Sequence, residues 1–310
     1  MTPALPVRPP RLRPGDRVAV VAPCGPLAPE RLDGGLDVLR GWDLDPVAAP
    51  HARGTHPTLR HLAATDEQRA RDLQEAWCDP SVRAVFAGRG GYGAQRMVDL
   101  LDWDAIRAAA PKPLVGFSDV TVLHEAFAVR AGVSTLHGPA VAGEVFLKDE
   151  ATREHLRRTL FAPESVRTLT APSVRPLVPG RARGVTLGGC LTMLASETGT
   201  AGARRDAAGG LLLLEDVGEP PYRLDRALTQ LLRAGRLDGV AGIVLGSWAR
   251  CGPYDQVRAV LVDRLAGFGV PVAEEFGFGH GDTALTVPLG VPAELDTTAG
   301  TLTFEVPATV

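Results

Sequence analysis

The first half of the chain alternates short apolar runs with amphipathic stretches. Apolar runs of four to six residues predict buried strands over 17–22, 82–87, 114–117 and 133–136. Apolar positions at helical spacing predict helices over 29–40, 66–77, 94–101 and 120–130. Strands that alternate with helices in this way predict a parallel sheet covered by helices.

The pattern breaks at residues 163–183, which are rich in proline and glycine. Beyond this stretch we expect strands over 211–214 and 240–246, helices over 222–234 and 255–266, and three short β segments, 284–287, 293–295 and 302–306. The prediction is therefore an N-terminal α/β domain over 1–162 with a parallel sheet, a crossover linker over 163–183, and a smaller, β-rich α/β domain over 184–310.

Composition and charge narrow the class of protein. The chain has 310 residues, of which 45% are apolar and 22% charged, with a formal net charge of −3. The absence of a basic run argues against nucleic acid as a partner. No apolar segment approaches the roughly 18 residues that span a bilayer, and proline and arginine occupy the N-terminus where a signal peptide needs an apolar core. Four cysteines lie far apart, which fits a reducing cytoplasm without disulfides.

The stretch "PLVGFSDVTVLHEAF" places Ser118 between a predicted strand and a predicted helix. Serine is a good helix N-cap, and the stretch by itself favours that interpretation. The alternative is a nucleophile, because ligands gather at the carboxyl ends of strands and the helix N-terminus offers N–H groups to an oxyanion. The nucleophile-elbow pattern is incomplete, since Val120 stands where a second glycine is usual.

The loop "GRGGYG" follows another predicted strand and has the G-x-G-x-x-G spacing at Gly88, Gly90 and Gly93. A dinucleotide site also needs an acidic residue at the end of a following strand, about 20 residues on, and none stands there. The other use of such a loop is to bring a backbone N–H close to a reacting carbonyl.

Two further stretches carry candidate catalytic groups. "LLLLED" places Glu215 and Asp216 at the end of a buried strand, where carboxylates are costly unless paired or exposed in a cleft. His280 stands between two glycines, which argues for a loop. The histidines at 51, 56 and 61 are spaced by five, so no two share a helical face, and we expect neither a metal site nor a cofactor.

Several segments together resemble the LD-carboxypeptidase family, which includes muramoyltetrapeptide carboxypeptidases and microcin-immunity peptidases. They follow the family's order along nearly the whole chain: "VAPCGP", "RAVFAGRGGYGAQRMVDLLDWDAI", "PKPLVGFSDVTVLHEAF", "LHGP", "LGGCLTMLASETGT", "LLLLEDVGEPPYRLDRALTQLLRAG" and "FGHGDTALTVPLG". One departure is Cys24, where the family pattern leads us to expect serine.

The resemblance implies a serine peptidase with Ser118 as nucleophile, His280 as base and Glu215 as the acid that orients it. It implies an oxyanion hole made by the N–H groups of Asp119 and Gly91. It also implies a flavodoxin- or amidotransferase-like N-terminal domain, a site between the two domains, and a homodimer.

The substrate that the resemblance implies is the murein tetrapeptide, cleaved before its terminal D-alanine during cytoplasmic peptidoglycan recycling. A guanidinium suits the substrate's free carboxylate, and the candidates are Arg89 and Arg226, between which the sequence does not choose. Two alternatives stay open: an immunity-type peptidase that cleaves aminoacyl-nucleotide antibiotics, and a non-catalytic protein that binds a nucleotide at the glycine loop.

Overall fold

The computed structural model describes residues 5–310, and its first sheet carries six strands in the order β12-β5-β4-β3-β1-β2. The strands are β1 (Arg17–Val21), β2 (Asp45–Ala48), β3 (Val82–Ala87), β4 (Leu114–Gly116), β5 (Thr135–His137) and β12 (Val287–Leu289). The first five are parallel, and β12 pairs antiparallel with β5. Their apolar side chains are buried on both faces, as a parallel sheet between helices requires.

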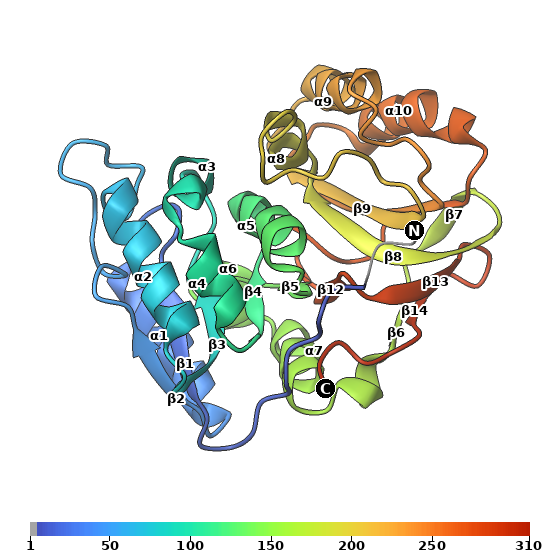
Figure 1. Cartoon of the computed structure of the whole chain (residues 1–310). Coiled ribbons are helices and arrows are strands. Elements are labelled where there is room, and N and C mark those ends of the chain that lie inside the picture. The colour runs from blue at the N-terminus through green and yellow to red at the C-terminus, as the bar shows by residue number, and fades with distance from the viewer. Residues whose placement is uncertain (1–4) are drawn as a thin grey trace.

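Helices cover both faces of this sheet (Figure 1). They are α1 (Pro29–Gly41), α2 (Asp66–Cys78), α3 (Ala94–Met97), α4 (Trp103–Ala108), α5 (Thr121–Ala126), α6 (Glu144–Lys148) and α7 (Glu150–Phe161), with the short helical segments η1 (Val98–Leu100), η2 (Ser118–Val120), η3 (Phe127–Ala131) and η4 (Pro163–Val166). Side chains of α2, α4 and η3, such as Trp77, Trp103 and Phe127, pack on one face. Side chains of α1, α6 and α7, such as Leu36 and Phe146, pack on the other.

The second sheet has eight strands in the order β6-β14-β13-β8-β9-β10-β11-β7. They are β6 (Thr168–Leu169), β7 (Arg175–Val178), β8 (Arg181–Cys190), β9 (Gly210–Val217), β10 (Gly242–Ala249), β11 (Val272–Glu274), β13 (Pro292–Asp296) and β14 (Thr301–Phe304). The strands β8 to β11 are parallel, and antiparallel strands complete both edges.

One face of the second sheet is covered by α8 (Leu191–Ser196), α9 (Pro221–Arg233) and α10 (Tyr254–Leu265), followed by η5 (Ala266–Phe268) (Figure 1). In α9 the buried residues recur at helical spacing, at Leu224, Leu228 and Leu231. They pack on Leu212, Leu214 and their neighbours in the sheet. The alternate strand residues face a second apolar cluster that contains Phe276 and Phe278.

The predicted fold class, a parallel α/β sheet domain followed by a second α/β unit rich in strands, is confirmed. The secondary structure differs in places. The strand β8 (Arg181–Cys190) begins inside the predicted linker, and the helix α7 (Glu150–Phe161) was not expected. The division into domains at residues 162 and 184 stays a prediction. The strand β12, from the C-terminal part of the chain, pairs within the first sheet. The strands β6 and β7, from the predicted linker, pair within the second sheet.

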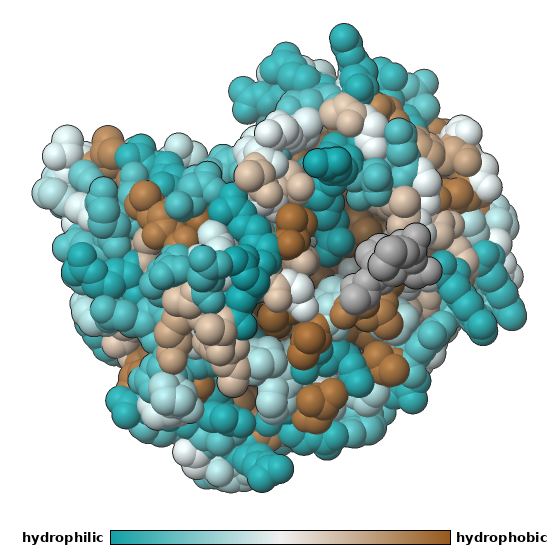
Figure 2. All heavy atoms as spheres, in the orientation of Figure 1, coloured by the Kyte–Doolittle hydropathy of each residue, from teal (hydrophilic) through white to brown (hydrophobic). Residues whose placement is uncertain are grey.

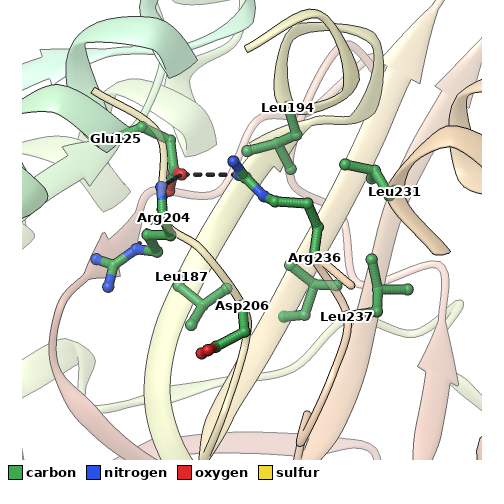
Figure 3. A pocket seen from close by; sticks show the side chains of 9 residues that line it. Glu125, Leu187, Leu194, Arg204, Asp206, Leu231, Arg236 and Leu237 are labelled. Atoms are coloured by element: carbon green, nitrogen blue, oxygen red, sulfur yellow. Dashed lines mark hydrogen bonds and ion pairs between the residues drawn. The ribbon is translucent and has the colours of Figure 1, made fainter. Parts of the chain in front are cut away.

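A buried cluster of charges connects the two halves of the chain. Glu125 of α5 accepts hydrogen bonds from Arg204 Nε at 3.2 Å and from Arg236 Nη2 at 3.0 Å, and the Glu125 side chain is 3% exposed. In Figure 3 a dashed line joins the Glu125 carboxylate to the guanidinium of Arg236. A cavity of about 10 Å³ lies beside this pair, the space of about one water molecule.

Glu125→Ala is expected to lower the free energy of unfolding by about 3–5 kcal/mol, because it leaves the buried Arg236 without a carboxylate. Denaturant titration of the whole chain measures this. Glu154→Ala is the matched control. Its pair with Arg157 is exposed, so removal should change stability by less than about 1 kcal/mol. Equal effects in the two variants would contradict the structural role of Glu125.

Candidate active site

Ser118 stands directly after the carboxyl end of β4, in a strained turn. Its φ is +64°, in the left-handed region that non-glycine residues rarely adopt. The helices η2 and α5 begin here without any side-chain cap, so Ser118 does not serve as an N-cap. A serine forced into this conformation on a strand-to-helix turn has the geometry of a nucleophile elbow.

The glycine loop lies against this serine. A Cβ on Gly90 would lie 2.8 Å from the Cβ of Ser118 and 3.1 Å from its Oγ, so the residue must be glycine. Gly91 has a φ of +106°, and its N–H donates no hydrogen bond among residues 5–310. The carboxylate of Asp119 accepts a hydrogen bond from the N–H of Ala94 at 2.8 Å. This bond fastens the end of the glycine loop to the serine turn.

Glu215 lies on β9 in the middle of the second sheet, and its side chain is fully buried. Its neighbour Asp216 makes a different set of contacts, as strand alternation requires. The Asp216 carboxylate accepts hydrogen bonds from the N–H and the hydroxyl of Thr192, at 2.8 and 2.6 Å, near the start of α8. Asp216 therefore anchors a helix, and Glu215 is the carboxylate that faces the histidine.

His280 lies in the loop between β11 and β12, and its Nδ1 is 2.6 Å from Glu215 Oε2. The preceding Gly279 has a φ of +95°, and a Cβ there would lie 2.5 Å from the same carboxylate oxygen. Glycine at 279 therefore allows the loop to approach Glu215. The ring of His280 packs on Phe117, with centroids 4.5 Å apart, which brings the histidine next to the residue that precedes Ser118.

The carboxylate of Glu215 is held in its ionised form. Burial on its own raises the pKa of a carboxyl group, but His280 and His137 outweigh this and lower the pKa of Glu215 to about 2. An anion beside the imidazole favours the Nδ1–H tautomer, which leaves Nε2 as the basic nitrogen.

Contacts across the two sheets position these residues. The hydroxyl of Thr121, on the helix after Ser118, accepts a hydrogen bond from the N–H of Cys190 at 3.0 Å. Cys190 is the Cα partner of Glu215 in the adjacent strand. On the other side of the site, Thr152 and His155 of α7 accept hydrogen bonds from the N–H groups of Ala284 and Thr286, in the loop after His280.

His155 is expected to make stability depend on pH. Burial lowers the pKa of His155 to about 4, from an ordinary value of 6.5. Between these two pH values the unfolded chain binds the proton more readily than the folded chain. The contribution of neutral His155 to the free energy of unfolding is therefore complete above pH 6.5 and is lost as the pH falls towards 4. The loss is at most about 3 kcal/mol.

Unfolding free energies measured from pH 7.5 to 4 test this in the wild type and in His155→Asn, which keeps an acceptor for Thr286 but does not titrate. Over this pH range the free energy of unfolding of His155→Asn should fall less steeply than that of the wild type. Parallel curves would contradict the assignment.

The two arginine candidates lie in different places. Arg89 is exposed in the glycine loop, beside Gly90, and donates to the carbonyl of Pro26 at 3.1 Å. Arg226 is exposed on α9, where its guanidinium lies 5.5 Å from the ring centre of Tyr222. Only Arg89 is adjacent to a residue that touches Ser118.

One residue at the site was not singled out from the sequence. His137, in the segment "LHGP", ends β5 and places its Nε2 3.6 Å from Glu215 Oε1. Its position at the carboxyl end of a predicted parallel strand is the sequence feature that could have identified it as a site residue.

Comparisons with known proteins agree with this architecture. The family model of the LD-carboxypeptidase N-terminal domain matches residues 18–138, and that of the C-terminal domain matches residues 183–295. A putative carboxypeptidase of Streptomyces coelicolor is 66% identical over 302 residues, covering 97% of each chain. The murein tetrapeptide carboxypeptidase of Pseudomonas aeruginosa is 37% identical over 291 residues, covering 90% of this chain and 93% of the relative.

A solved structure of a muramoyltetrapeptide carboxypeptidase from Oxalobacter formigenes superposes with a TM-score of 0.79 at 30% identity, covering 93% of this chain and 97% of that one. The chain belongs to the LD-carboxypeptidase family. It is a serine-type carboxypeptidase, a hydrolase. Within residues 5–310, no helix has the length and apolar character needed to cross a membrane.

Proposed function

We propose that this enzyme hydrolyses the bond between the L-configured centre of the diamino acid and the terminal D-alanine of the murein tetrapeptide, with Ser118, His280 and Glu215 as its triad. The observation that carries the proposal is the 2.6 Å hydrogen bond between His280 and the buried Glu215, beside a serine in a strained turn at the end of β4. The name of the Pseudomonas aeruginosa relative supports the murein substrate.

The steps follow from the chemistry of these groups. His280 Nε2 takes the proton of the Ser118 hydroxyl as its oxygen attacks the peptide carbonyl. Glu215 stays ionised and stabilises the imidazolium that forms. His280 then gives the proton to the leaving amine of D-alanine, and a water molecule hydrolyses the acyl-enzyme by the same route.

The N–H groups of Asp119 and Gly91 are assigned to the oxyanion hole. Gly91 qualifies because its N–H has no partner among the described residues and its loop lies against Ser118. Donors of this kind act where negative charge develops on the carbonyl oxygen.

A carboxypeptidase must also recognise the free carboxylate of its substrate. We assign this role to Arg89, because its loop contacts the serine and a guanidinium binds a carboxylate through two parallel hydrogen bonds. Arg226 remains the second candidate. The proposal includes a cytoplasmic role in peptidoglycan recycling and a homodimeric state, which sedimentation analysis of the purified chain would test.

The test is D-alanine release, followed by mass spectrometry, from tetrapeptides that carry meso-diaminopimelate, lysine or ornithine at the third position. The wild type should release D-alanine from at least one of them, and Ser118→Ala should not. Ser173→Ala, an exposed serine of the linker, is the matched control and should be as active as the wild type. Cleavage of aminoacyl-sulfamoyl nucleotides without action on any tetrapeptide would overturn the murein assignment in favour of an immunity-type activity.

A further inference from the structure

The carboxylate of Glu215 faces two histidines. Its Oε2 binds His280, and its Oε1 has no hydrogen-bond partner among the described residues. A buried carboxylate oxygen without a partner is costly. On this side of the carboxylate, Nε2 of His137 lies 3.6 Å from Oε1.

His137 is held in place from several directions. Its Cα pairs with Gly116 on β4 and with Val287 on β12, so the residue lies between the strand that leads to Ser118 and the strand that follows the His280 loop. The rings of Phe117 and Phe278 meet its imidazole edge to face, with centroids 6.1 and 5.8 Å away.

The imidazole of His137 is 2% exposed, and neither of its nitrogens has a hydrogen-bond partner among residues 5–310. The other titratable side chain packed beside it is His124, whose ring centroid is 6.2 Å away. Nε2 of His124 donates to the carbonyl of Gly116 at 2.9 Å, and burial lowers the pKa of His124 to about 3, so this neighbour is neutral. Glu215 is therefore the acceptor that the geometry offers to His137.

A separation of 3.6 Å is longer than a hydrogen bond. Catalytic hydrogen bonds are often long in a free enzyme and shorten in the complex with substrate. A displacement of less than 1 Å, by either side chain, would bring the two atoms within bonding distance.

We propose that His137 is a positioning residue of the reaction, whose Nε2–H donates to Glu215 Oε1 when substrate is bound. The carboxylate is then held at both oxygens, so it cannot rotate away from His280 and stays aligned as the imidazolium forms. The proposal rests on the triad assigned above. His137 acts through Glu215 and touches neither the substrate nor the serine.

The test compares two substitutions of similar size. His137→Leu removes the donor, whereas His137→Gln keeps an amide N–H near the position of Nε2. We expect His137→Leu to lower kcat about 10- to 100-fold with KM changed less than about threefold, and His137→Gln to recover most of that loss. An unchanged kcat in His137→Leu, or an equal loss in both variants, would overturn the proposal, since an equal loss indicates packing alone.

A measurement that leaves His137 in place covers the case in which His137→Leu does not fold. The ¹⁵N spectrum of labelled Ser118→Ala with tetrapeptide bound should show His137 as the Nε2–H tautomer, and a ring proton on Nδ1 in that complex would refute the proposed bond. Ser118→Ala and Glu215→Gln are assayed in the same series. If either remains active, the triad itself is wrong. If both are inactive while His137→Leu matches the wild type, only the role of His137 fails.

Discussion

His280→Ala is expected to lower kcat by about four to six orders of magnitude, the loss seen when a member of a serine triad is removed. Among residues 5–310, His280 is the titratable side chain that both packs on Phe117 and lies within hydrogen-bond distance of Glu215. Without the imidazole, the serine keeps its proton and the leaving amine receives none. Steady-state D-alanine release, supported by single-turnover assays for the weak variant, measures the loss.

The control for this experiment is His56→Ala. The ring of His56 accepts hydrogen bonds from the N–H groups of Thr58 and Leu59 in a surface loop, so its bonds are local and involve no triad residue. Its kcat should stay within about threefold of the wild type. A loss of less than tenfold in His280→Ala would show that another group takes the serine proton.

Glu215→Gln is expected to lower kcat by about four orders of magnitude while the fold is retained, since a neutral amide neither stabilises the imidazolium nor secures the correct tautomer. Glu219→Gln is the matched substitution four residues away. Among residues 5–310, the carboxylate of Glu219 accepts a side-chain hydrogen bond from Arg223 alone, at 3.4 Å, whereas His280 is bonded to Glu215. It should therefore retain activity near that of the wild type.

Kinetics with tetrapeptide and thermal melting of both variants separate an effect on the reaction from an effect on stability. An inactive Glu219→Gln together with an active Glu215→Gln would reverse the assignment of the acid. The serine-peptidase class of the chain would stand in that case, because it rests on the family.

Local sequence patterns predicted most of the strands and helices that carry the site. The run Leu211–Leu214 is apolar on both faces, so it had to be an interior strand, and the residue after it had to lie at the sheet's carboxyl end. The apolar run before Ser118 led to the same kind of position. Glycines around His280 predicted a loop, and one of them, Gly279, is required by its closeness to Glu215.

Other features depend on contacts between distant segments, which local patterns do not contain. The strand Asp45–Ala48 contains a proline and an aspartate, so its sequence does not indicate a strand, and pairing with β1 creates it. The helix Glu150–Phe161 was not predicted, because its many charged residues leave few apolar positions from which helical spacing can be recognised, although Asp149 caps its start. His137 had no visible partner in the sequence, because Glu215 lies 78 residues further along the chain and reaches it only through the packing of the two sheets.

The pairing of β12 with β5 also bears on how the protein is made. The first sheet takes its sixth strand from residues 287–289, far along the chain from β5 (Thr135–His137). During synthesis, the edge of β5 therefore stays uncovered until residues 287–289 have also emerged from the ribosome. An open strand edge can pair with another chain. Nascent chains on crowded polysomes are therefore most exposed to mispairing in this interval, and any stop of translation before residue 287 leaves that edge permanently open.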